Sequence, residues 1–426
     1  MKIVQISAVE ILDSRGTPTL EACVVLENGS KGSAAVPSGA STGSYEAVEL
    51  RDNDPDRYNG LGVRQAINNV EQKIAPKLIG MEARDQKAID QTMITLDGTE
   101  NKGNLGANAI LAVSMATARA AANAENVPLY AYLSQLNPDF NGEYILPIPM
   151  MNIMNGGKHA NWATDIQEYM ILPVGAKNMA DAVRMCAETY FQLKMVLKIK
   201  EYNTNVGDEG GFAPNVASNH EPFELMAEAV KEAGYELGKD IVFGIDAAAS
   251  EFFAEGKYQL KKEKKVVDSL ELHQFYRSLM RDYPIKSMED IFSEDDWTGF
   301  AEITASTEGR VQIVGDDLYV TNIKRLQKGI DMMATNSVLV KLNQIGTLTE
   351  TIEAIVMARK NNFTAVISHR SGETEDDFIA DLVVAMGTGQ IKTGAPCRSE
   401  RTAKYNRLVK IEKELGAKAK MAVFPF

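Results

Sequence analysis

In the second half of the chain, five successive apolar runs each end in a charged or titratable residue, and this pattern restricts the possible folds most strongly. The terminal residues are Asp246, Glu289, Asp316, Lys341 and His369, separated by 43, 27, 25 and 28 residues. Each interval is long enough for a strand, a loop and a returning helix, as in parallel βα units. Because parallel strands of a barrel bring their carboxyl ends to one rim, we expect these side chains to meet at the mouth of a (β/α) barrel. The alternative for any single residue is that it caps a helix or solubilises a loop.

The first third of the chain has a different pattern. Residues 3–37 alternate apolar and polar side chains around an Asn-Gly turn, which predicts a small antiparallel meander. A Gly/Ser-rich stretch at 37–43 precedes three helical patterns, of which 108–124 is the clearest. Turn residues at 136–142 then break the pattern. We therefore predict an α/β protein with an α+β domain at 1–137 and a barrel domain at 138–426.

Composition excludes several classes of protein. The apolar share of 45% and the charged share of 24% are those of a globular chain. A net charge of −13 opposes direct binding to nucleic acid or to an anionic membrane. We expect no membrane span, because no run of about 18 apolar residues occurs. The scattered Cys23, Cys186 and Cys397, without an export signal near Met1, predict a reducing compartment and thus the cytoplasm.

The three carboxylates among the strand ends point to a metal ion. Crowding Asp246, Glu289 and Asp316 together without a cation would raise their pKa values and destabilise the fold. Ligands that are all oxygen favour Mg²⁺ or Mn²⁺ over Zn²⁺, and we expect magnesium. Lys341 is next in strand order, and nearby metal cations would favour its neutral form, which makes it a candidate general base. The alternative is that Lys341 only pairs with the carboxylates.

Two further segments carry groups suited to an anionic substrate. Residues 368–374 place an imidazole, a guanidinium and hydroxyls at one strand end, which suits a phosphate or a carboxylate. In 205–212, Asp208 and Glu209 precede two glycines, so that a ligand could approach the backbone closely beside an acid. The alternative for the second segment is a plain tight turn.

Together these motifs resemble the enolase family over essentially the whole chain. The strings that carry the resemblance are Asp13-Ser14-Arg15-Gly16, Ser38-Gly39-Ala40-Ser41-Thr42-Gly43, Asn155-Gly156-Gly157-Lys158-His159-Ala160, Gln167-Glu168, Gly207-Asp208-Glu209-Gly210-Gly211-Phe212-Ala213-Pro214, Lys341-Leu342-Asn343-Gln344-Ile345-Gly346-Thr347, Ser368-His369-Arg370-Ser371-Gly372-Glu373-Thr374 and Lys392-Thr393-Gly394-Ala395-Pro396-Cys397-Arg398. So many long strings in one order make chance agreement negligible.

The resemblance implies a fold and a reaction. The N-terminal domain is expected to cap a C-terminal (β/α)₈ TIM-like barrel with an irregular ββαα start, whose antiparallel strands we expect at 150–154 and 168–173. The implied enzyme is a homodimeric carbon–oxygen lyase of glycolysis and gluconeogenesis. It would interconvert 2-phospho-D-glycerate, a small phosphorylated hydroxy acid, with phosphoenolpyruvate and water.

The resemblance also implies residue roles. Asp246, Glu289 and Asp316 would hold one magnesium ion, and Ser41 would help a second one bind with the substrate. Lys341 would be the base at carbon 2, and Glu209, assisted by Glu168, the acid at carbon 3. Substrate contacts are implied for His159, Gln167, His369, Arg370, Ser371 and Lys392. Among these, Arg370 and Ser371 would bind the phosphate and Lys392 the carboxylate.

Departures from the family pattern are few. The family more often has other residue types at the positions of Lys158, Trp162 and Leu61. We expect these changes to affect the rate of loop movement or the binding of partners rather than the reaction. His220 and His273 fall outside every motif and are expected to be plain surface or core residues.

Two rival functions stay open from the sequence. The first is another acid dehydratase of the same superfamily, acting on a different acid. The second is a binding or scaffold role, in which the surface docks an RNA-processing enzyme or a host protein, with a second location at the cell surface. This second role could coexist with catalysis.

Overall fold

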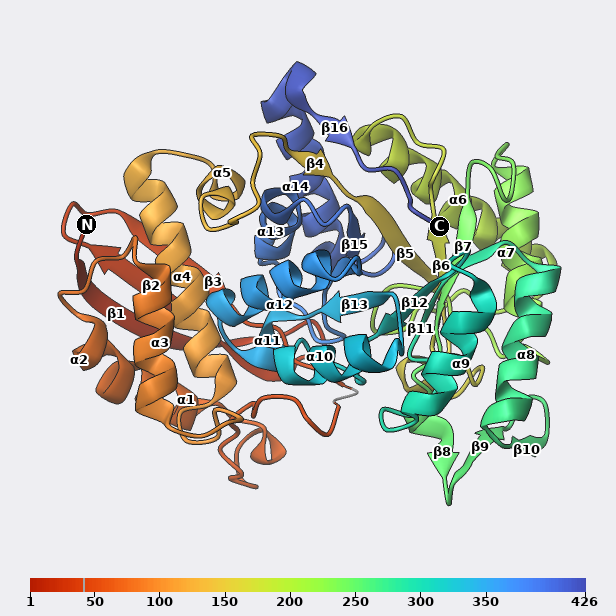
Figure 1. The fold of residues 1–426 in the computed structure, drawn as a ribbon, viewed down its shortest axis with the longest axis horizontal. Helices are drawn as coiled ribbons and strands as arrows, with labels where there is room; N and C mark the ends of the chain where they lie inside the picture. The colour runs from red at the N-terminus through yellow and green to blue at the C-terminus, as the bar shows by residue number, and fades with distance from the viewer. Residues whose placement is uncertain (41–42) are drawn as a thin grey trace.

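The computed structural model describes residues 1–40 and 43–426. Figure 1 shows a smaller N-terminal part, coloured red to orange, beside a larger part that contains the barrel. Ser41, which the resemblance assigns to the second magnesium ion, lies outside the described residues.

The N-terminal part is an antiparallel sheet covered by helices, as the sequence predicts. Within the described ranges its strands pair in the order β1–β2–β3. Helix α4 is rich in alanine, a strong helix former, and packs on β2 and β3. A Cβ atom at Gly32 would lie 2.2 Å from the Ala120 nitrogen, so only glycine permits this close approach. The elements are β1 (Ile3–Leu12), β2 (Pro18–Leu26), β3 (Lys31–Ala35), η1 (Tyr58–Gly60), α1 (Arg64–Asn69), η2 (Val70–Ile74), α2 (Ala75–Leu78), α3 (Gln86–Asp97), α4 (Ala107–Glu125) and α5 (Leu129–Ser134).

The larger part is a closed barrel. In the described part of the chain, eight strands close in the order β11–β12–β13–β14–β15–β5–β6–β7. They are β5 (Ile148–Asn155), β6 (Glu168–Leu172), β7 (Val242–Asp246), β11 (Ile285–Glu289), β12 (Gln312–Gly315), β13 (Ser337–Val340), β14 (Thr364–Ser368) and β15 (Gln390–Lys392). Strand β6 is antiparallel to both neighbours, β5 and β7. This confirms the predicted irregular start.

The predicted strand ends are confirmed. Asp246 and Glu289 are the last residues of β7 and β11, and Asp316, Lys341 and His369 directly follow β12, β13 and β14. The strands that end in these residues are parallel neighbours in the barrel. Their carboxyl ends therefore meet at one rim.

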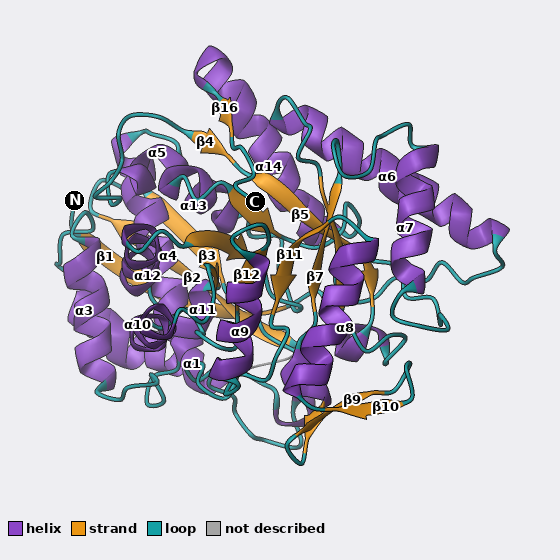
Figure 2. Ribbon diagram, turned by 45° about the vertical axis from the view of Figure 1, so that its right-hand side comes forward, coloured by secondary structure: helices purple, strands orange, loops and turns teal. Residues whose placement is uncertain are grey.

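Helices surround the barrel, as Figure 2 shows in purple around the orange strands. In α6, Met179, Ala182, Cys186, Leu193 and Leu197 are buried and lie on one face of the helix. The helices of this part are α6 (Met179–Ile199), α7 (Glu221–Glu232), α8 (Ser269–Asp282), α9 (Trp297–Thr307), α10 (Ile323–Met332), α11 (Leu342–Ile345), α12 (Leu348–Lys360), α13 (Phe378–Met386) and α14 (Ser399–Leu415), with short helical turns η3 (Gly157–Ala160), η4 (Ala249–Phe252) and η5 (Gly416–Lys418). Short accessory strands are β4 (Ile145–Leu146), β8 (Phe253–Ala254), β9 (Lys257–Leu260), β10 (Lys265–Val267) and β16 (Lys420–Met421).

The interior of the barrel beneath these strand termini is filled by apolar side chains, from the first residues of β5 and β7 up to Val314 and Leu339. This bottom cluster consists of Ile148, Met150, Met170, Leu172, Val242, Val314, Leu339 and Val366. Met421, Ala422 and Phe424 of the C-terminal tail pack against it. The bottom of the barrel is thus covered by the chain's own last residues.

The two parts share a packed boundary. Helices α3 and α4 contact α12, and α5 contacts α13. Buried Asp90 of α3 accepts hydrogen bonds from the amide and the hydroxyl of Thr349 in α12, at 2.9 and 2.6 Å. A turn at 137–140 connects α5 toward β4. The division of the chain at 137/138 stays a prediction.

Among residues 1–40 and 43–426, no helix combines the length and the apolar character that a bilayer crossing requires.

Candidate active site

Side chains from many strand ends line one small cavity at the mouth of the barrel. The lining residues are His159, Gln167, Glu168, Glu209, Asp246, Ala248, Asp290, Asp316, Asp317, Lys341, Ser368, His369, Arg370, Ser371 and Lys392. Glu289 is fully buried and reaches this cavity through a contact with Lys392. All described residues that the sequence and the resemblance select are therefore brought together.

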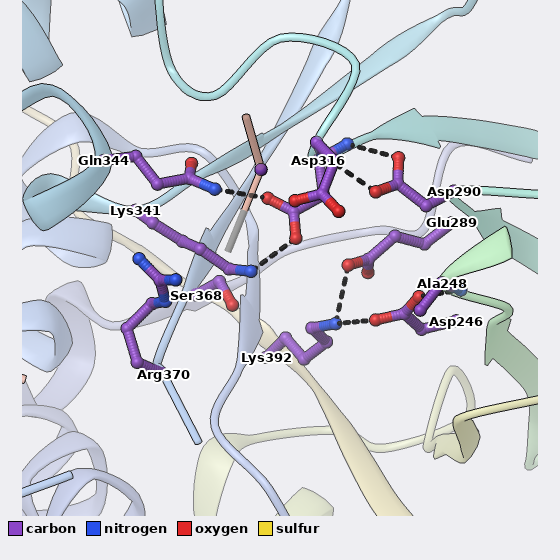
Figure 3. Close-up of polar contacts among 12 residues, drawn as sticks. Asp246, Ala248, Glu289, Asp290, Asp316, Lys341, Gln344, Ser368, Arg370 and Lys392 are labelled. Carbon is purple, nitrogen blue, oxygen red and sulfur yellow. Dashed lines mark hydrogen bonds and ion pairs between the residues drawn. The ribbon is translucent and has the colours of Figure 1, made fainter. Parts of the chain in front are cut away.

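Lys392, the last residue of β15, lies among the carboxylates. Its Nζ atom is 2.7 Å from Glu289 Oε1, 3.1 Å from Asp246 Oδ2 and 3.3 Å from Glu168 Oε1. Figure 3 shows the contacts to Glu289 and Asp246 as dashed lines. Burial opposes the charge on Lys392, yet Asp246 and Glu168 hold the pKa of this amine well above its usual value. A permanent positive charge thus stands between β6, β7 and β11.

Lys341 forms an ion pair with Asp316, which also accepts a 2.9 Å hydrogen bond from Gln344 Nε2 (Figure 3). Burial opposes the charge on Lys341, but the Asp316 carboxylate raises the pKa of the lysine. The pairing alternative considered for Lys341 is therefore present in the structure. Because Lys341 also lines the cavity, the pairing leaves the amine within the site.

The carboxylates are crowded in a way that fits a hard divalent cation. Burial, with Asp246 next to it, raises the pKa of Glu289 well above its usual value, and burial together with Glu209 does the same for Glu168. Within the residues that the structure describes, Glu168 Oε2 and Glu289 Oε2 are buried without a hydrogen-bond partner. Magnesium prefers such oxygen ligands. Carboxylate oxygens of the kind that the predicted ion binds are therefore present, while Lys392 Nζ contacts both Asp246 and Glu289.

A second acidic group adjoins this set. Asp290, Asp316 and Asp317 can each offer an oxygen so that all three atoms lie within 4.8 Å of one another. Asp290 accepts hydrogen bonds from the amides of Asp316 and Asp317, both at 2.8 Å. The sequence interpretation missed Asp290 and Asp317, although each directly follows a predicted ligand. The acidic doublets Glu289-Asp290 and Asp316-Asp317 were the available signal.

Glu209 lies between two imidazoles. Its carboxylate oxygens are 3.4 Å from His369 Nε2 and 3.6 Å from His159 Nδ1. Burial lowers the pKa of His369 to about 3 and also lowers the pKa of His159. Both rings are therefore neutral near pH 7.

Asn152 Nδ2 donates a 2.9 Å hydrogen bond to Glu209. Asn152 was missed, although a polar residue inside the apolar run 150–154 was a usable signal.

At the predicted phosphate end, Arg370 reaches to the N-terminal part of the molecule. Its guanidinium donates to Glu46 at 2.9 and 3.0 Å and to Asn343 Oδ1 at 2.9 Å. Burial opposes the charge on Arg370, but Glu46 raises the pKa of this group. The hydroxyl of Ser371 accepts a 2.7 Å hydrogen bond from the Ala40 amide. The N-terminal part therefore meets the barrel at this end of the cavity.

Of the three residues that depart from the family pattern, Lys158 and Trp162 lie on the loop that carries His159. Lys158 Nζ is 3.2 Å from Glu251 Oε1, and the Trp162 ring lies 4.7 Å from Lys261 Nζ. Both contacts are made by the loop that carries His159. Leu61 is exposed in the N-terminal part. His220 and His273 do not line the cavity: the first packs near Phe275, and the second contacts Ser306.

Two family models match the chain. One, described as the enolase N-terminal domain, covers residues 3–133, and the other, described as the enolase C-terminal TIM barrel domain, covers residues 143–424. Together they include nearly every element described above, in the same order along the chain.

Proposed function

The chain belongs to the enolase family, whose members are lyase-type dehydratases, and from this premise we propose that it catalyses the reversible dehydration of 2-phospho-D-glycerate to phosphoenolpyruvate. The proposal rests on the set of side chains that line the cavity at the mouth of the barrel. One cavity holds an amine directly after β13, a carboxyl group between neutral imidazoles, and a guanidinium–hydroxyl pair for a phosphate. Each of these groups is needed at a different atom of this substrate.

We propose that Asp246, Glu289 and Asp316 hold one magnesium ion, and that Ser41 helps a second ion bind with the substrate. A proton next to an ionised carboxylate is very weakly acidic, because its removal adds negative charge to that carboxylate. Bound magnesium supplies the positive charge that stabilises this added charge. Lys392, held near Asp246 and Glu289, adds a fixed positive charge and is assigned to the substrate carboxylate.

The proton transfers are assigned to groups at two strand ends and one loop. Lys341 Nζ is assigned to take the proton from carbon 2 in its neutral form, which a magnesium ion bound at Asp316 would favour. Glu209 passes a proton to the hydroxyl that leaves carbon 3, so that water is released, and Glu168, whose pKa is raised well above its usual value by burial and by Glu209, supplies that proton. His159 and His369 flank Glu209 as neutral rings and therefore add no competing positive charge at this end.

Phosphate recognition is assigned to Arg370 and Ser371. A planar guanidinium binds phosphate oxygens in a bidentate manner. Arg370 already binds a carboxylate, Glu46, in this manner, which supports its suitability for an anion. Gln167 completes the proposed substrate contacts from the cavity wall.

The decisive experiment measures the ultraviolet absorbance of the conjugated product. The protein is treated with a chelator, magnesium is titrated back, and 2-phosphoglycerate is added. We expect turnover to disappear on chelation and to return with magnesium. No product after magnesium is restored to the intact protein would refute the proposal.

A second assay separates the proposal from the rival acid dehydratase. Phosphorylated and unphosphorylated hydroxy acids are compared for the wild type and for Arg370→Gln. We expect the wild type to prefer the phosphorylated acid and the variant to lose that preference. Arg407→Met is a matched control, because Arg407 on α14 pairs with Asp381 outside the cavity lining. A wild-type preference for the unphosphorylated acid would favour the rival.

We also propose a homodimer that works in the cytoplasm. Cys23, Cys186 and Cys397 are free, which supports a reducing compartment. Light scattering on the purified protein tests the oligomeric state.

A further inference from the structure

Arg401, in the first turn of α14, is a buried cation that the proposed reaction does not yet use. Its side chain is 0% exposed. The aliphatic stem passes Gly394, where a Cβ atom would lie 2.9 Å from Arg401 Cδ and 2.6 Å from the Glu209 carbonyl oxygen. The absence of a side chain at Gly394 therefore opens the path by which the guanidinium enters the site.

The guanidinium of Arg401 binds two separate segments of the site. One terminal nitrogen donates to His369 Nδ1 at 2.7 Å and to the Arg370 carbonyl at 2.5 Å. The other donates to the Ser371 carbonyl at 2.6 Å and to the Asp208 carbonyl at 3.0 Å. One side chain thus connects the strand end 369–371 to the loop that carries Glu209.

These bonds determine where the His369 ring carries its proton. A guanidinium has only donors and stays protonated in proteins. His369 Nδ1 must therefore accept, and the ring proton of the neutral imidazole lies on Nε2. This Nε2 atom is the one that lies 3.4 Å from Glu209 Oε2. A proton on Nδ1 would point at an Arg401 N–H group.

We propose that Arg401 is a positioning residue of the reaction: it fixes His369 as the Nε2–H tautomer facing Glu209 and holds both against the strand end that carries Arg370 and Ser371. The catalytic meaning of this inference rests on the proposed function. The tautomer itself can be measured without any turnover.

The charges around His369 agree with this role. Glu209 faces the ring from the 205–213 loop, Arg401 from α14 and Lys392 from β15. His159 shares Glu209 on its other oxygen. Burial and the two cations favour the neutral ring, while Glu209 favours the charged ring. Loss of Arg401 removes both a cation and the donor to Nδ1, so the pKa of His369 is expected to rise.

The first test is NMR of the whole enzyme labelled with ¹⁵N-histidine, with His369→Gln used for assignment. In the wild type we expect Nδ1 to be unprotonated and Nε2 to be protonated from about pH 5 to about pH 8. In Arg401→Met we expect mixed tautomers or titration within this range. Arg407→Met is the control and should keep the wild-type pattern, because Arg407 is a partly buried arginine of α14 that pairs with Asp381. A wild-type His369 protonated on Nδ1, or an unchanged pattern in Arg401→Met, would overturn the proposal.

The second test is kinetic. Arg401→Met is expected to lower kcat by about 10²-fold, the effect of lost positioning, with little change in KM and with a new acidic limb in the pH profile. Arg401→Lys keeps the positive charge but lacks the two terminal nitrogens of the guanidinium, so it should restore only part of kcat. An equal loss of kcat in Arg407→Met, or an unchanged pH profile in Arg401→Met, would contradict the proposal.

The outcomes of the two proposals can be separated. If the wild type does not turn over 2-phosphoglycerate, the proposed function fails, while the NMR pattern still decides the role of Arg401. If Arg401→Met does not fold, the wild-type tautomer and the Arg401→Lys variant decide it.

Discussion

The two ends of the barrel are built from the same strands but bury opposite kinds of side chain. The bottom cluster is apolar and is covered by the C-terminal tail, whereas the mouth buries carboxylates, lysines and an arginine. Strand β13 shows the contrast over two residues: Leu339 lies in the bottom cluster, and Lys341 directly after the strand lines the cavity. Burial stabilises the fold at the bottom, while at the mouth it costs stability and creates reactivity. The comparison therefore predicts that stability and activity can be changed separately.

The largest expected effect is on activity at the mouth. Lys341→Ala removes the proposed base, and we expect kcat with 2-phosphoglycerate to fall by about 10⁴-fold, the upper range for general base catalysis. With magnesium present, the unfolding midpoint should change little, because the proposed ion would replace Lys341 as the partner of Asp316. Steady-state kinetics and denaturant unfolding measure the two quantities. A variant that keeps a substantial part of kcat would remove Lys341 from the mechanism.

The opposite result is expected two residues earlier on the same strand. Leu339→Ala leaves a cavity in the bottom cluster and should lower the free energy of unfolding by about 4 kcal/mol. The kcat of the folded enzyme should stay at the wild-type value. Leu339→Met, which nearly conserves volume, is the matched control and should cost less than about 1.5 kcal/mol. If kcat fell together with stability, the separation of the two barrel ends would be wrong.

A buried carboxylate away from the mouth sharpens the comparison. Asp90 is held by neutral donors, and burial raises its pKa to about 6 despite hydrogen bonds from Thr349, Ser114 and Gln86. The folded state binds this proton more tightly than the unfolded state, so the contribution of Asp90 to the free energy of unfolding is fully present below about pH 4. As the pH rises through about 6, this contribution is lost, which lowers the free energy of unfolding by about 3 kcal/mol in total.

The difference in unfolding free energy between the wild type and Asp90→Asn, measured from about pH 4 to about pH 7, isolates this contribution. Other titrating groups cancel in this difference. A difference that does not depend on pH would show that Asp90 ionises in the folded state as it does in water.

The smallest expected effect concerns the tail. Phe424 is partly buried against the bottom cluster, so Phe424→Ala should lower the unfolding free energy by about 1 kcal/mol and leave kcat unchanged. Thermal unfolding and the same kinetic assay measure both. A reduced kcat would mean that the covering of the bottom affects the mouth.

The strand-end residues could be predicted because topology alone brings them together. A run of apolar residues that ends in Asp316 or Lys341 gives its rim position without any knowledge of partners. His159, Gln167 and Glu168 came from the resemblance, since they lie on a loop and at the start of a strand. Most residues of the site could therefore be predicted, whereas Asn152, Asp290, Asp317 and Arg401 were missed.

The contacts inside the site could not be predicted in this way. The ion pairs of Lys392 join it to residues 103 to 224 positions away, and Arg370 meets Glu46 across 324 positions. Such pairs depend on side-chain directions that periodicity does not contain. Arg401 carries no strand-end signal at all, because it enters the site from the first turn of a helix.

The reversed direction of β6 has a consequence for how this barrel can vary. Asn155 at the end of β5 pairs with Glu168 at the start of β6, so the two ends of the intervening loop are held next to each other by strand pairing in the barrel wall. Insertions or deletions between these residues would leave the register of every barrel strand as it is. Because His159 and Gln167 lie at this segment and line the cavity, a change in its length would reshape the rim without shifting the strands beneath it.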